Sequence, residues 1–353
     1  MSRLLEQPSG GMTYAQAGVS IVAGDEVVTR IAGAVARTKR PEVLGGIGGF
    51  GGLFALDTAK YRQPVLVASA DGVGTKLEVA RRVGRYDSVG IDLVAMLVDD
   101  LACVGAEPLF LLDYVAVGSL NPARLEELVG GIARGCELAN TALLGGETAE
   151  HGGVMKPDDL DVAGFAVGVV ERGRELGPDR VREGDALVGL ASPGLRSNGY
   201  SLARRILITS DAALHEAAFA GAERSLGEEL LVPSVIYAPT VTAMIAQLGD
   251  AVHAAAHVTG GGITGNVGRL LSTTLDAVIE MESFTTPEIF YEIQRRGGVG
   301  ADEMVRVFNC GLGMVVALEP TAADASIELA RSLGVSASVV GRVTSGGGRV
   351  VLT

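Results

Sequence analysis

Short apolar runs alternate with longer stretches of helical periodicity along the 353 residues of the chain. The apolar runs predict buried strands at 64–70, 109–118, 160–170, 186–192, 307–319 and 337–343, and a strand that runs into a glycine turn within 141–151. Apolar residues spaced three or four apart predict helices at 23–39, 90–105, 121–140, 197–208, 237–249 and 325–334. Asn121 and Pro122 suit the N-cap and the first position of the third helix. Because helices and strands are mixed throughout, we predict an α+β or α/β fold.

A charged stretch with several glycines and a proline, Glu171–Asp185, separates two such sets of elements. This composition is typical of linkers between domains. We therefore predict an N-terminal domain over residues 1–175 and a C-terminal domain over 176–353, each long enough to bury its own core. Residues 1–20 are polar and predict a mobile lead-in.

Composition and charge narrow the classes of function. Hydrophobic residues make up 48% and charged residues 20%, which is typical of a globular protein. The net charge of −13 argues against broad binding to nucleic acids or to anionic membranes. Cys103, Cys136 and Cys310 each lie in an apolar stretch, which predicts buried free thiols and a cytoplasmic protein. We expect neither a signal peptide nor a membrane span.

The first candidate site directly follows the predicted strand at 64–70 and reads Asp71-Gly72-Val73-Gly74-Thr75-Lys76. Glycines let backbone N–H groups approach an anion, and a helix N-terminus favours negative charge. Asp71 could hold a Mg²⁺ ion on nucleotide phosphates, while Lys76 neutralises their oxygens. Only four of the 29 basic residues are lysines, which favours a role for Lys76 that a planar guanidinium cannot fill.

This stretch is not a Walker A loop, because its lysine follows the threonine and no Gly-Lys pair occurs in the chain. The alternative interpretation is a tight strand-to-helix turn that carries a surface aspartate and lysine. The residues alone leave both interpretations open.

Carboxylates near the predicted strand ends are the second candidate. Asp99 and Asp100 lie in an otherwise apolar helix, where a buried carboxylate is costly unless it is paired or binds a metal. Asp100 could join Asp71 on Mg²⁺, or this helix face could be turned to water. Glu147 follows an apolar run and a glycine pair, so it could be a third ligand, a turn carboxylate or a helix N-cap.

In the second half, two loops could bind a phosphate through Asn198 and through the amides of Gly260, Gly261 and Gly262. Each could equally be a loop cap. His253 and His257 are four residues apart on a possible helix, where packing explains two histidines better than a metal does.

Taken together, these stretches resemble the phosphoribosylformylglycinamidine cyclo-ligase family, the aminoimidazole ribonucleotide synthetases of purine synthesis. The resemblance runs from about Tyr14 to the C-terminus. It rests on nine segments in the family's order and spacing, "RPEVLGGIGGFGGLFAL", "DGVGTKL", "GIDLVAM", "GAEPLFLLDY", "GGETAE", "DVAGFAVGVVE", "SNGYSL", "HVTGGG" and "FNCGLGM".

The resemblance implies a two-domain ATP-binding fold, in which the N-terminal sheet forms a barrel across a homodimer and the C-terminal domain is α/β. It implies that ATP and Mg²⁺ drive ring closure of formylglycinamidine ribonucleotide. The implied metal ligands are Asp71, Asp100 and Glu147, and the implied catalytic residues are these three with Lys76 and Arg196. The implied nucleotide contacts are Gly48, Gly49, Phe50, Gly51, Asp71, Gly72, Gly74, Thr75, Lys76, Asn198, Thr259, Gly260, Gly261 and Gly262.

The chain departs from the family pattern at a few positions. Arg196 replaces a histidine, Asp99 replaces an asparagine, and Ser20 and His151 replace other family residues. Because arginine stays protonated, we expect Arg196 to bind the substrate phosphate rather than to transfer protons. His151 and His257 are then the imidazoles available for proton transfer.

Two other functions are compatible with the same residues. A small-molecule kinase of the same superfamily would phosphorylate its substrate without closing a ring. A non-catalytic nucleotide-binding subunit would bind ATP without releasing ADP.

Overall fold

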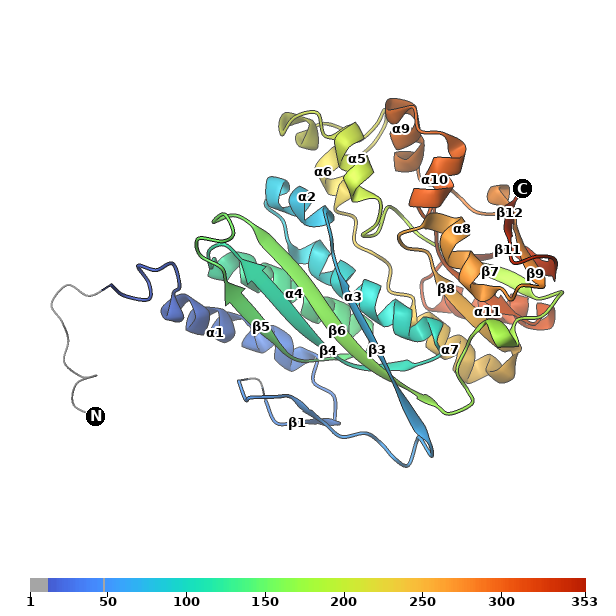
Figure 1. Cartoon of the computed structure of the whole chain (residues 1–353), viewed down its shortest axis with the longest axis horizontal. Coiled ribbons are helices and arrows are strands. Elements are labelled where there is room, and N and C mark those ends of the chain that lie inside the picture. Colours follow the sequence, from blue (N-terminus) through green and yellow to red (C-terminus); the bar gives the residue numbers. More distant parts are fainter. Residues whose placement is uncertain (1–11, 47) are drawn as a thin grey trace.

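The structure is a computed structural model that describes residues 12–46 and 48–353, so most of the predicted lead-in lies outside the described residues. Two sheets dominate it, one in each half of the chain (Figure 1). The first has the strand order β3-β6-β4-β5, and the second has the order β12-β9-β11-β7-β10-β8. The mixed α and β prediction is confirmed at the level of these elements.

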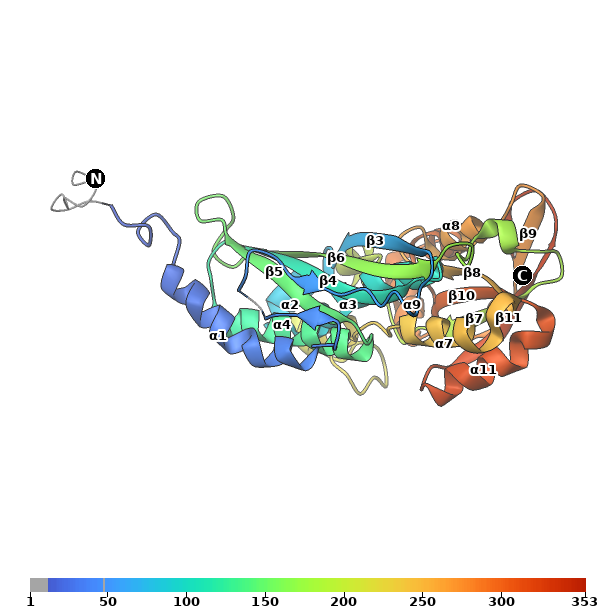
Figure 2. The same ribbon diagram turned by 90° about the horizontal axis from the view of Figure 1, so that it is seen from below.

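The N-terminal half is a sheet covered by helices on one face. Its strands are β3 (Pro64–Gly72), β4 (Glu107–Val117), β5 (Ala142–Glu150) and β6 (Leu160–Glu171), and a short hairpin is formed by β1 (Val43–Leu44) and β2 (Leu53–Phe54). Its helices are α1 (Ile21–Arg37), α2 (Lys76–Val83), α3 (Asp87–Cys103) and α4 (Pro122–Leu138). Helix α3 packs on the sheet and on α4, and α1 packs on α4. Figure 2 shows the opposite face of the sheet without a helical layer.

The local signals in this half act as predicted. Asn121 caps α4 by accepting a hydrogen bond from the backbone N–H of Arg124, and Pro122 opens the helix. Helix α3 is buried along most of its length, as its apolar sequence predicts. The predicted glycine turn before Glu147 is wrong, because β5 continues through Gly145 and Gly146 in register with β4.

The C-terminal half surrounds a mostly antiparallel sheet with helices. Its strands are β7 (Ala186–Ala191), β8 (Val252–His257), β9 (Leu275–Ile279), β10 (Leu312–Leu318), β11 (Ala337–Ser345) and β12 (Val350–Leu352). Its helices are α5 (Tyr200–Leu207), α6 (Leu226–Leu230), α7 (Ala238–Leu248), α8 (Gly262–Val267), α9 (Glu288–Gly297), α10 (Ala301–Val307) and α11 (Ala323–Ser332). His253 and His257 lie on strand β8 and both are buried, so the possible helix there is wrong.

Two expectations concern the chain as a whole. Cys103, Cys136 and Cys310 are all free, as predicted. Across residues 12–46 and 48–353, every helix is too short or too polar to cross a membrane.

Helix α3 joins the two halves, because it packs on β3 and β6 of the first sheet and on α7 and β8 of the second half. Residues near its C-terminal end therefore face both domains. Asp99 and Asp100 occupy this part of the helix.

Candidate active site at the domain junction

A cleft of about 340 Å³ lies where the end of β3 meets the loop before α5. One wall is the stretch 71–74, with Asp161 from the start of β6 beside it. Ser197 and Asn198 form the opposite wall. The structure thus brings the predicted Asp71, its glycines and Asn198 together across the two domains.

The turn after β3 is fixed by its backbone and by the second domain. Gly74 has a φ of +67°, a left-handed conformation that favours glycine, and α2 begins two residues later. The Thr75 hydroxyl lies 3.3 Å from that of Ser201, and the Thr75 carbonyl accepts a hydrogen bond from the Arg204 guanidinium. The N-terminus of α2 is therefore tied to α5.

The triple-glycine loop is close to the same wall. A Cβ on Gly260 would lie 3.5 Å from the side-chain oxygen of Asn198. The buried amide of Asn266 donates to the carbonyls of Thr259, Gly260 and Gly262, which fixes the loop. Gly262 has a φ of +61°, and a Cβ there would lie 2.1 Å from a backbone oxygen of α10, so only glycine fits.

Asp71 lines this cleft, and Asp100 is close enough for its charge to act on Asp71, so we call these two residues the acidic pair. Burial and the neighbouring Asp100 charge raise the pKa of Asp71, while the Gly72 N–H, which donates to the carboxylate, opposes the shift. The Asp100 side chain is 48% exposed, and its carboxylate lies 2.9 Å from Nδ1 of His257. Two partly exposed carboxylates beside a glycine turn form a donor set that suits a hard cation.

Lys76 corrects a prediction, because its side chain is fully buried beneath the cleft. Its ammonium pairs with Asp92 at 2.5 Å and donates to the carbonyls of Arg196 and Val232. Burial lowers the pKa of Lys76, and the Asp92 charge opposes this shift. An ammonium has three N–H donors, and all three are engaged by the protein, so Lys76 has none left for a phosphate.

Arg196 corrects a second prediction, because its guanidinium is buried and does not line the cleft. It donates to Asp99 at 2.8 Å, to Nε2 of His257 at 2.8 Å and to the Val235 carbonyl at 2.6 Å. Its backbone has a φ of +62°, a conformation that turns the side chain inward while Ser197 and Asn198 reach the cleft. A substrate phosphate cannot reach this guanidinium here.

Asp99 is also directed away from the acidic pair. It is fully buried, and one oxygen accepts the backbone N–H groups of Tyr237 and Ala238 at the start of α7. Its other oxygen pairs with Arg196. Asp99 thus joins α3 to a helix N-terminus of the second domain, where a negative charge is favourable.

Glu147 and the predicted loop Gly48–Gly51 lie elsewhere in the chain. The residues opposite Asp71 on the next three strands are Gly164, Asp113 and Gly146. Glu147 follows Gly146, so three strand spacings, roughly 14 Å, separate it from Asp71. Its partner across the strands is Tyr114, on the exposed face of the sheet. Glu147 is therefore not part of the acidic pair within one chain.

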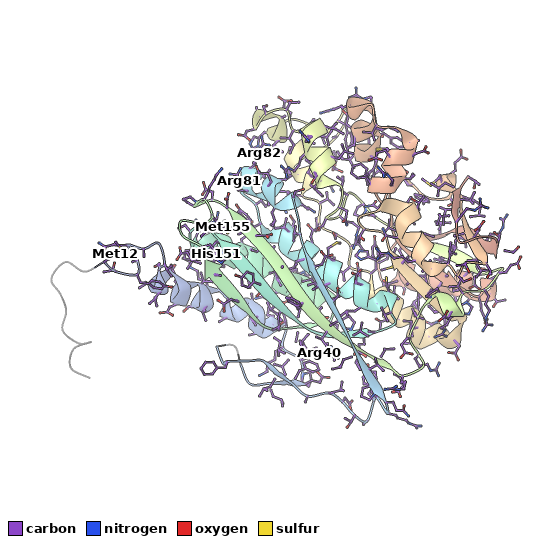
Figure 3. The ribbon with its side chains drawn as sticks, in the orientation of Figure 1. Met12, Arg40, Arg81, Arg82, His151 and Met155 are labelled. Atoms are coloured by element: carbon purple, nitrogen blue, oxygen red, sulfur yellow. The ribbon has the colours of Figure 1, made fainter. Side chains whose placement is uncertain are left out.

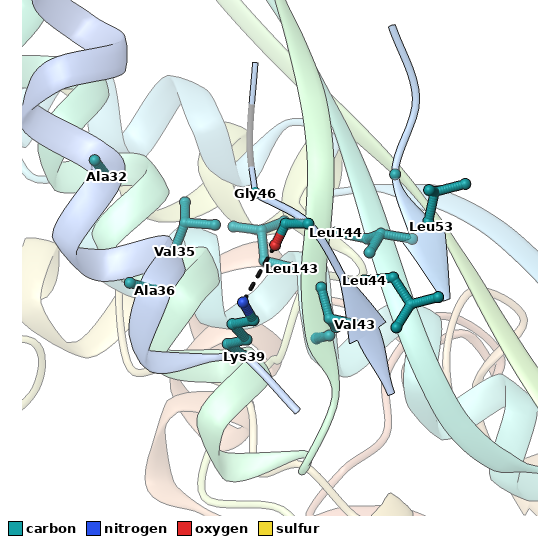
Figure 4. Close-up of a pocket in the computed structure, with 13 residues that line it drawn as sticks. Ala32, Val35, Ala36, Lys39, Val43, Leu44, Gly46, Leu53, Leu143 and Leu144 are labelled. Atoms are coloured by element: carbon teal, nitrogen blue, oxygen red, sulfur yellow. Dashed lines mark hydrogen bonds between the residues drawn. The ribbon is translucent and has the colours of Figure 1, made fainter. Parts of the chain in front are cut away.

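The loop 48–51 connects β1 to β2, and this hairpin borders a small apolar pocket with α1 and β5 (Figure 4). Lys39 of that pocket donates to the Gly45 carbonyl. Because β5 and β3 are opposite edges of the sheet, the loop is on the far edge from the cleft. The predicted contact between this loop and nucleotide is not made within one chain.

Of the two imidazoles considered for proton transfer, His151 is distant from the cleft. It follows β5, and its ring lies 3.3 Å from the hydroxyl of Tyr114 (Figure 3). His257 is next to the cleft but 5% exposed, so it contacts Asp100 rather than solvent.

Sequence reasoning missed three residues of this region. Asp161 lines the cleft, and an acidic residue at the start of a strand that pairs antiparallel with β3 is a signal that could have found it. Asp92 pairs with Lys76 of the preceding helix and accepts from Ser234, 142 residues away, while Asn266 donates to a loop backbone. No pattern along the sequence reveals such partners.

Comparisons with known proteins identify the family of the chain. The family described as AIR synthase related protein, N-terminal domain, matches residues 57–170, and the corresponding C-terminal domain matches residues 182–353. A phosphoribosylformylglycinamidine cyclo-ligase from Anaeromyxobacter sp. (strain Fw109-5) is 51% identical over 340 residues, covering 96% of this chain and 97% of the relative. The enzyme of the same name from Magnetococcus marinus is 47% identical and covers 97% of both chains.

Solved structures with the same fold are more distant in sequence. Thiamine-monophosphate kinase from Stenotrophomonas maltophilia K279a has a TM-score of 0.67 at 22% identity and covers 95% of this chain and 96% of that one. The hydrogenase maturation protein HypE in complex with ATP has a TM-score of 0.62 at 15% identity, covering 98% and 92%. These likenesses support the two-domain fold.

Proposed function

The chain belongs to the phosphoribosylformylglycinamidine cyclo-ligase family, and from this premise we propose that the cleft at the domain junction is where it uses ATP. The enzyme is an ATP-dependent, C–N bond-forming ligase of purine biosynthesis. It closes the imidazole ring of aminoimidazole ribonucleotide from formylglycinamidine ribonucleotide. The observation that carries the proposed site is one cleft lined by Asp71, Asp161, the glycine turn and Asn198.

The chemistry needs a better leaving group than an amide oxygen. Transfer of the γ-phosphoryl group to the formyl oxygen provides one, and the amidine nitrogen then attacks the same carbon as phosphate leaves. Phosphoryl transfer depends mainly on positioning and on neutralisation of charge. We assign the positioning to the backbone around Gly72 and Gly74, to Asn198 and to the triple-glycine loop.

The acidic pair fits Mg²⁺, which usually binds proteins through one or two carboxylates and fills its remaining positions with water and substrate phosphates. Asp71 and Asp100 supply two such groups, and Asp161 lines the same cleft. Among residues 12–46 and 48–353, no three His, Cys, Asp or Glu side chains form a ready-made metal cage. Bound there, Mg²⁺ would neutralise phosphate charge; we leave Glu147 out of the site.

A homodimer is the second part of the proposal. The sheet face without helices exposes Leu66 by 64%, Phe165 by 57% and Tyr114 by 40%, and all three are on adjacent strands. Single exposed apolar residues are ordinary, but a row of them on one sheet face marks an interaction surface. A second copy of the sheet would cover this row and close a barrel.

Such a barrel would bring the β5 edge of one subunit beside the β3 edge of the other. The loop Gly48–Gly51 would then be near the partner's cleft, which would reconcile its predicted nucleotide contact with its position in one chain. A mixture of two inactive variants, Phe50→Ala and Asp100→Asn, tests this arrangement. Recovery of activity in mixed dimers supports shared sites, and no recovery above either variant alone contradicts them.

The function itself is tested by incubating the purified protein with ATP, Mg²⁺ and formylglycinamidine ribonucleotide and identifying the products by mass. Ring-closed aminoimidazole ribonucleotide with equimolar ADP is expected. A phosphorylated, unclosed product would indicate a kinase, and ATP binding without ADP release would indicate a non-catalytic subunit.

A further inference from the structure

An unbroken chain of polar contacts leads from the buried junction to the acidic pair. Asp99 pairs with Arg196, Arg196 donates to His257, and His257 contacts Asp100. The separations along this chain are 2.8, 2.8 and 2.9 Å. Asp99, Arg196 and His257 are all buried, while Asp100 at the end is half exposed.

The direction of each hydrogen bond follows from donor chemistry. A guanidinium has only N–H donors and remains protonated in proteins, so Nε2 of His257 must accept from Arg196. The imidazole proton is then on Nδ1, where it can donate only to the atom that Nδ1 faces. That atom is Oδ1 of Asp100.

Further contacts hold the Arg196 guanidinium in place. Its other contacts are the Val235 carbonyl and the ring of Tyr237, whose centroid is 4.7 Å away. Asp99 is in turn fixed by two backbone N–H groups at the start of α7. The tautomer of His257 is therefore set by groups that belong to the packed junction.

We propose that His257 is a positioning residue that holds the Asp100 carboxylate in place through Nδ1–H, and that Arg196 and Asp99 fix the imidazole in this tautomer. The buried ring has no route to substrate, so its effect passes through Asp100. A carboxylate held by a donor on one oxygen presents its other oxygen in a defined direction. Partners of this kind that orient a metal ligand typically change metal affinity or activity by about 10- to 100-fold when mutated.

The expected effect on Mg·ATP binding rests on the proposed use of the cleft. The tautomer of His257 and its contact with Asp100 do not depend on that proposal. Two variants separate position from chemistry. In His257→Asn the amide nitrogen can occupy the place of Nδ1 and donate to Asp100. In His257→Gln the same amide reaches the place of Nε2, so Asp100 loses its donor.

The first measurement is a long-range ¹H–¹⁵N spectrum of protein labelled at its four histidines, with His257→Asn used to assign the signal. We expect the Nδ1–H tautomer in the wild type. The second is calorimetric binding of Mg·ATP together with thermal unfolding. We expect His257→Gln to weaken binding by about tenfold or more, while His257→Asn keeps most of the affinity at a similar melting temperature.

An Nε2–H tautomer in the wild type would overturn the proposal, as would equal binding losses in the two variants. The proposal would also be overturned if both variants bound Mg·ATP as tightly as the wild type. In that case the cyclo-ligase assignment would still stand as long as ring-closed product forms. If the tautomer and the Asn–Gln difference are found but no ring-closed product forms, the inference holds and the function fails.

Discussion

The cleft and the buried junction beneath it are built from the same three short segments, yet their side chains have opposite environments. Asp71 and Asn198 line the cleft and the Asp100 side chain is half exposed, so these groups remain available to a ligand. Lys76, Asp99 and Arg196 come from the same segments and are fully engaged inside the protein. A sequence motif in this molecule therefore mixes ligand-facing residues with residues that hold the two domains together.

The difference follows from local geometry. Asp99 and Asp100 are consecutive on α3, and consecutive helical residues point about 100° apart, so one faces α7 and the other faces the cleft. Asp71 ends a strand, whereas Lys76 begins a helix after a left-handed glycine turn. Functional and structural charges can thus be adjacent in sequence without sharing a site.

Removing the buried ammonium should have the largest effect on stability. Lys76→Met leaves the Asp92 carboxylate buried without its cation, and we expect the free energy of unfolding to fall by about 3–5 kcal/mol. Urea unfolding measures this loss. Lys76→Met with Asp92→Asn should recover much of it, since neither group is then charged.

Arg306→Met is the matched control, because its partner Glu303 is on the surface and exposed pairs contribute about 1 kcal/mol or less. If Lys76→Met unfolds like the wild type but no longer turns over ATP, Lys76 belongs to the cleft and the comparison between the two regions is broken.

Removing a carboxylate of the acidic pair should act on turnover instead. We expect Asp71→Asn or Asp100→Asn to lower kcat by about 100-fold or more, because each weakens charge neutralisation at the transferring phosphate. Steady-state kinetics at saturating ATP and Mg²⁺ measure the effect. Sedimentation should match that of the wild type, and near-normal activity in both variants would contradict the metal assignment.

The Arg196–Asp99 pair should show a coupling of about 1–3 kcal/mol in a double-mutant cycle. Arg196→Gln and Asp99→Asn each leave one charge buried alone, whereas the double variant leaves none. Urea unfolding of the four proteins gives the coupling. Additive losses would mean that the two charges do not stabilise one another, and the link from the junction to His257 would lose its anchor.

Much of the fold was predictable because its signals are local. The apolar periodicity of α3 and the Asn121–Pro122 start of α4 depend on residues within one element. The full length of strand β5 was harder to predict, because Gly145 and Gly146 favour a turn locally but are held in the strand by pairing with β4. His253 and His257 have a spacing that suits a helix, and only the sheet reveals a strand.

The site was predictable in part. Asp71 and Asn198 line one cleft, because the end of a strand and a loop meet at the domain junction. The scarcity of lysine favoured a phosphate contact for Lys76, whereas its ammonium pairs with the buried Asp92. Its acceptors, however, include the carbonyls of Arg196 and Val232, which are 120 and 156 residues away, so the sequence could not reveal a buried partner instead of a phosphate.

The smallest expected effect concerns the pH dependence of stability that Asp71 contributes at the cleft. The pKa of Asp71 is raised in the fold by burial and by Asp100, so its ionised form is disfavoured relative to the unfolded chain. Above the raised pKa the wild type should therefore be less stable than Asp71→Asn, by a few tenths of a kcal/mol at a partly exposed site (roughly the scale of surface charge pairs). Below the ordinary aspartate pKa, Asp71 is protonated in both the folded and the unfolded wild type, so the stability difference from Asp71→Asn should vanish. Urea unfolding at pH 7 and at pH 3.5 without Mg²⁺ measures this difference in stability.

Saturating Mg·ATP should reverse the order of the two stabilities at pH 7, because a ligand that binds the folded wild type more tightly stabilises it more. A wild type that is more stable than the variant at pH 7 without ligand would mean that Asp71 is already paired, as the junction residues are.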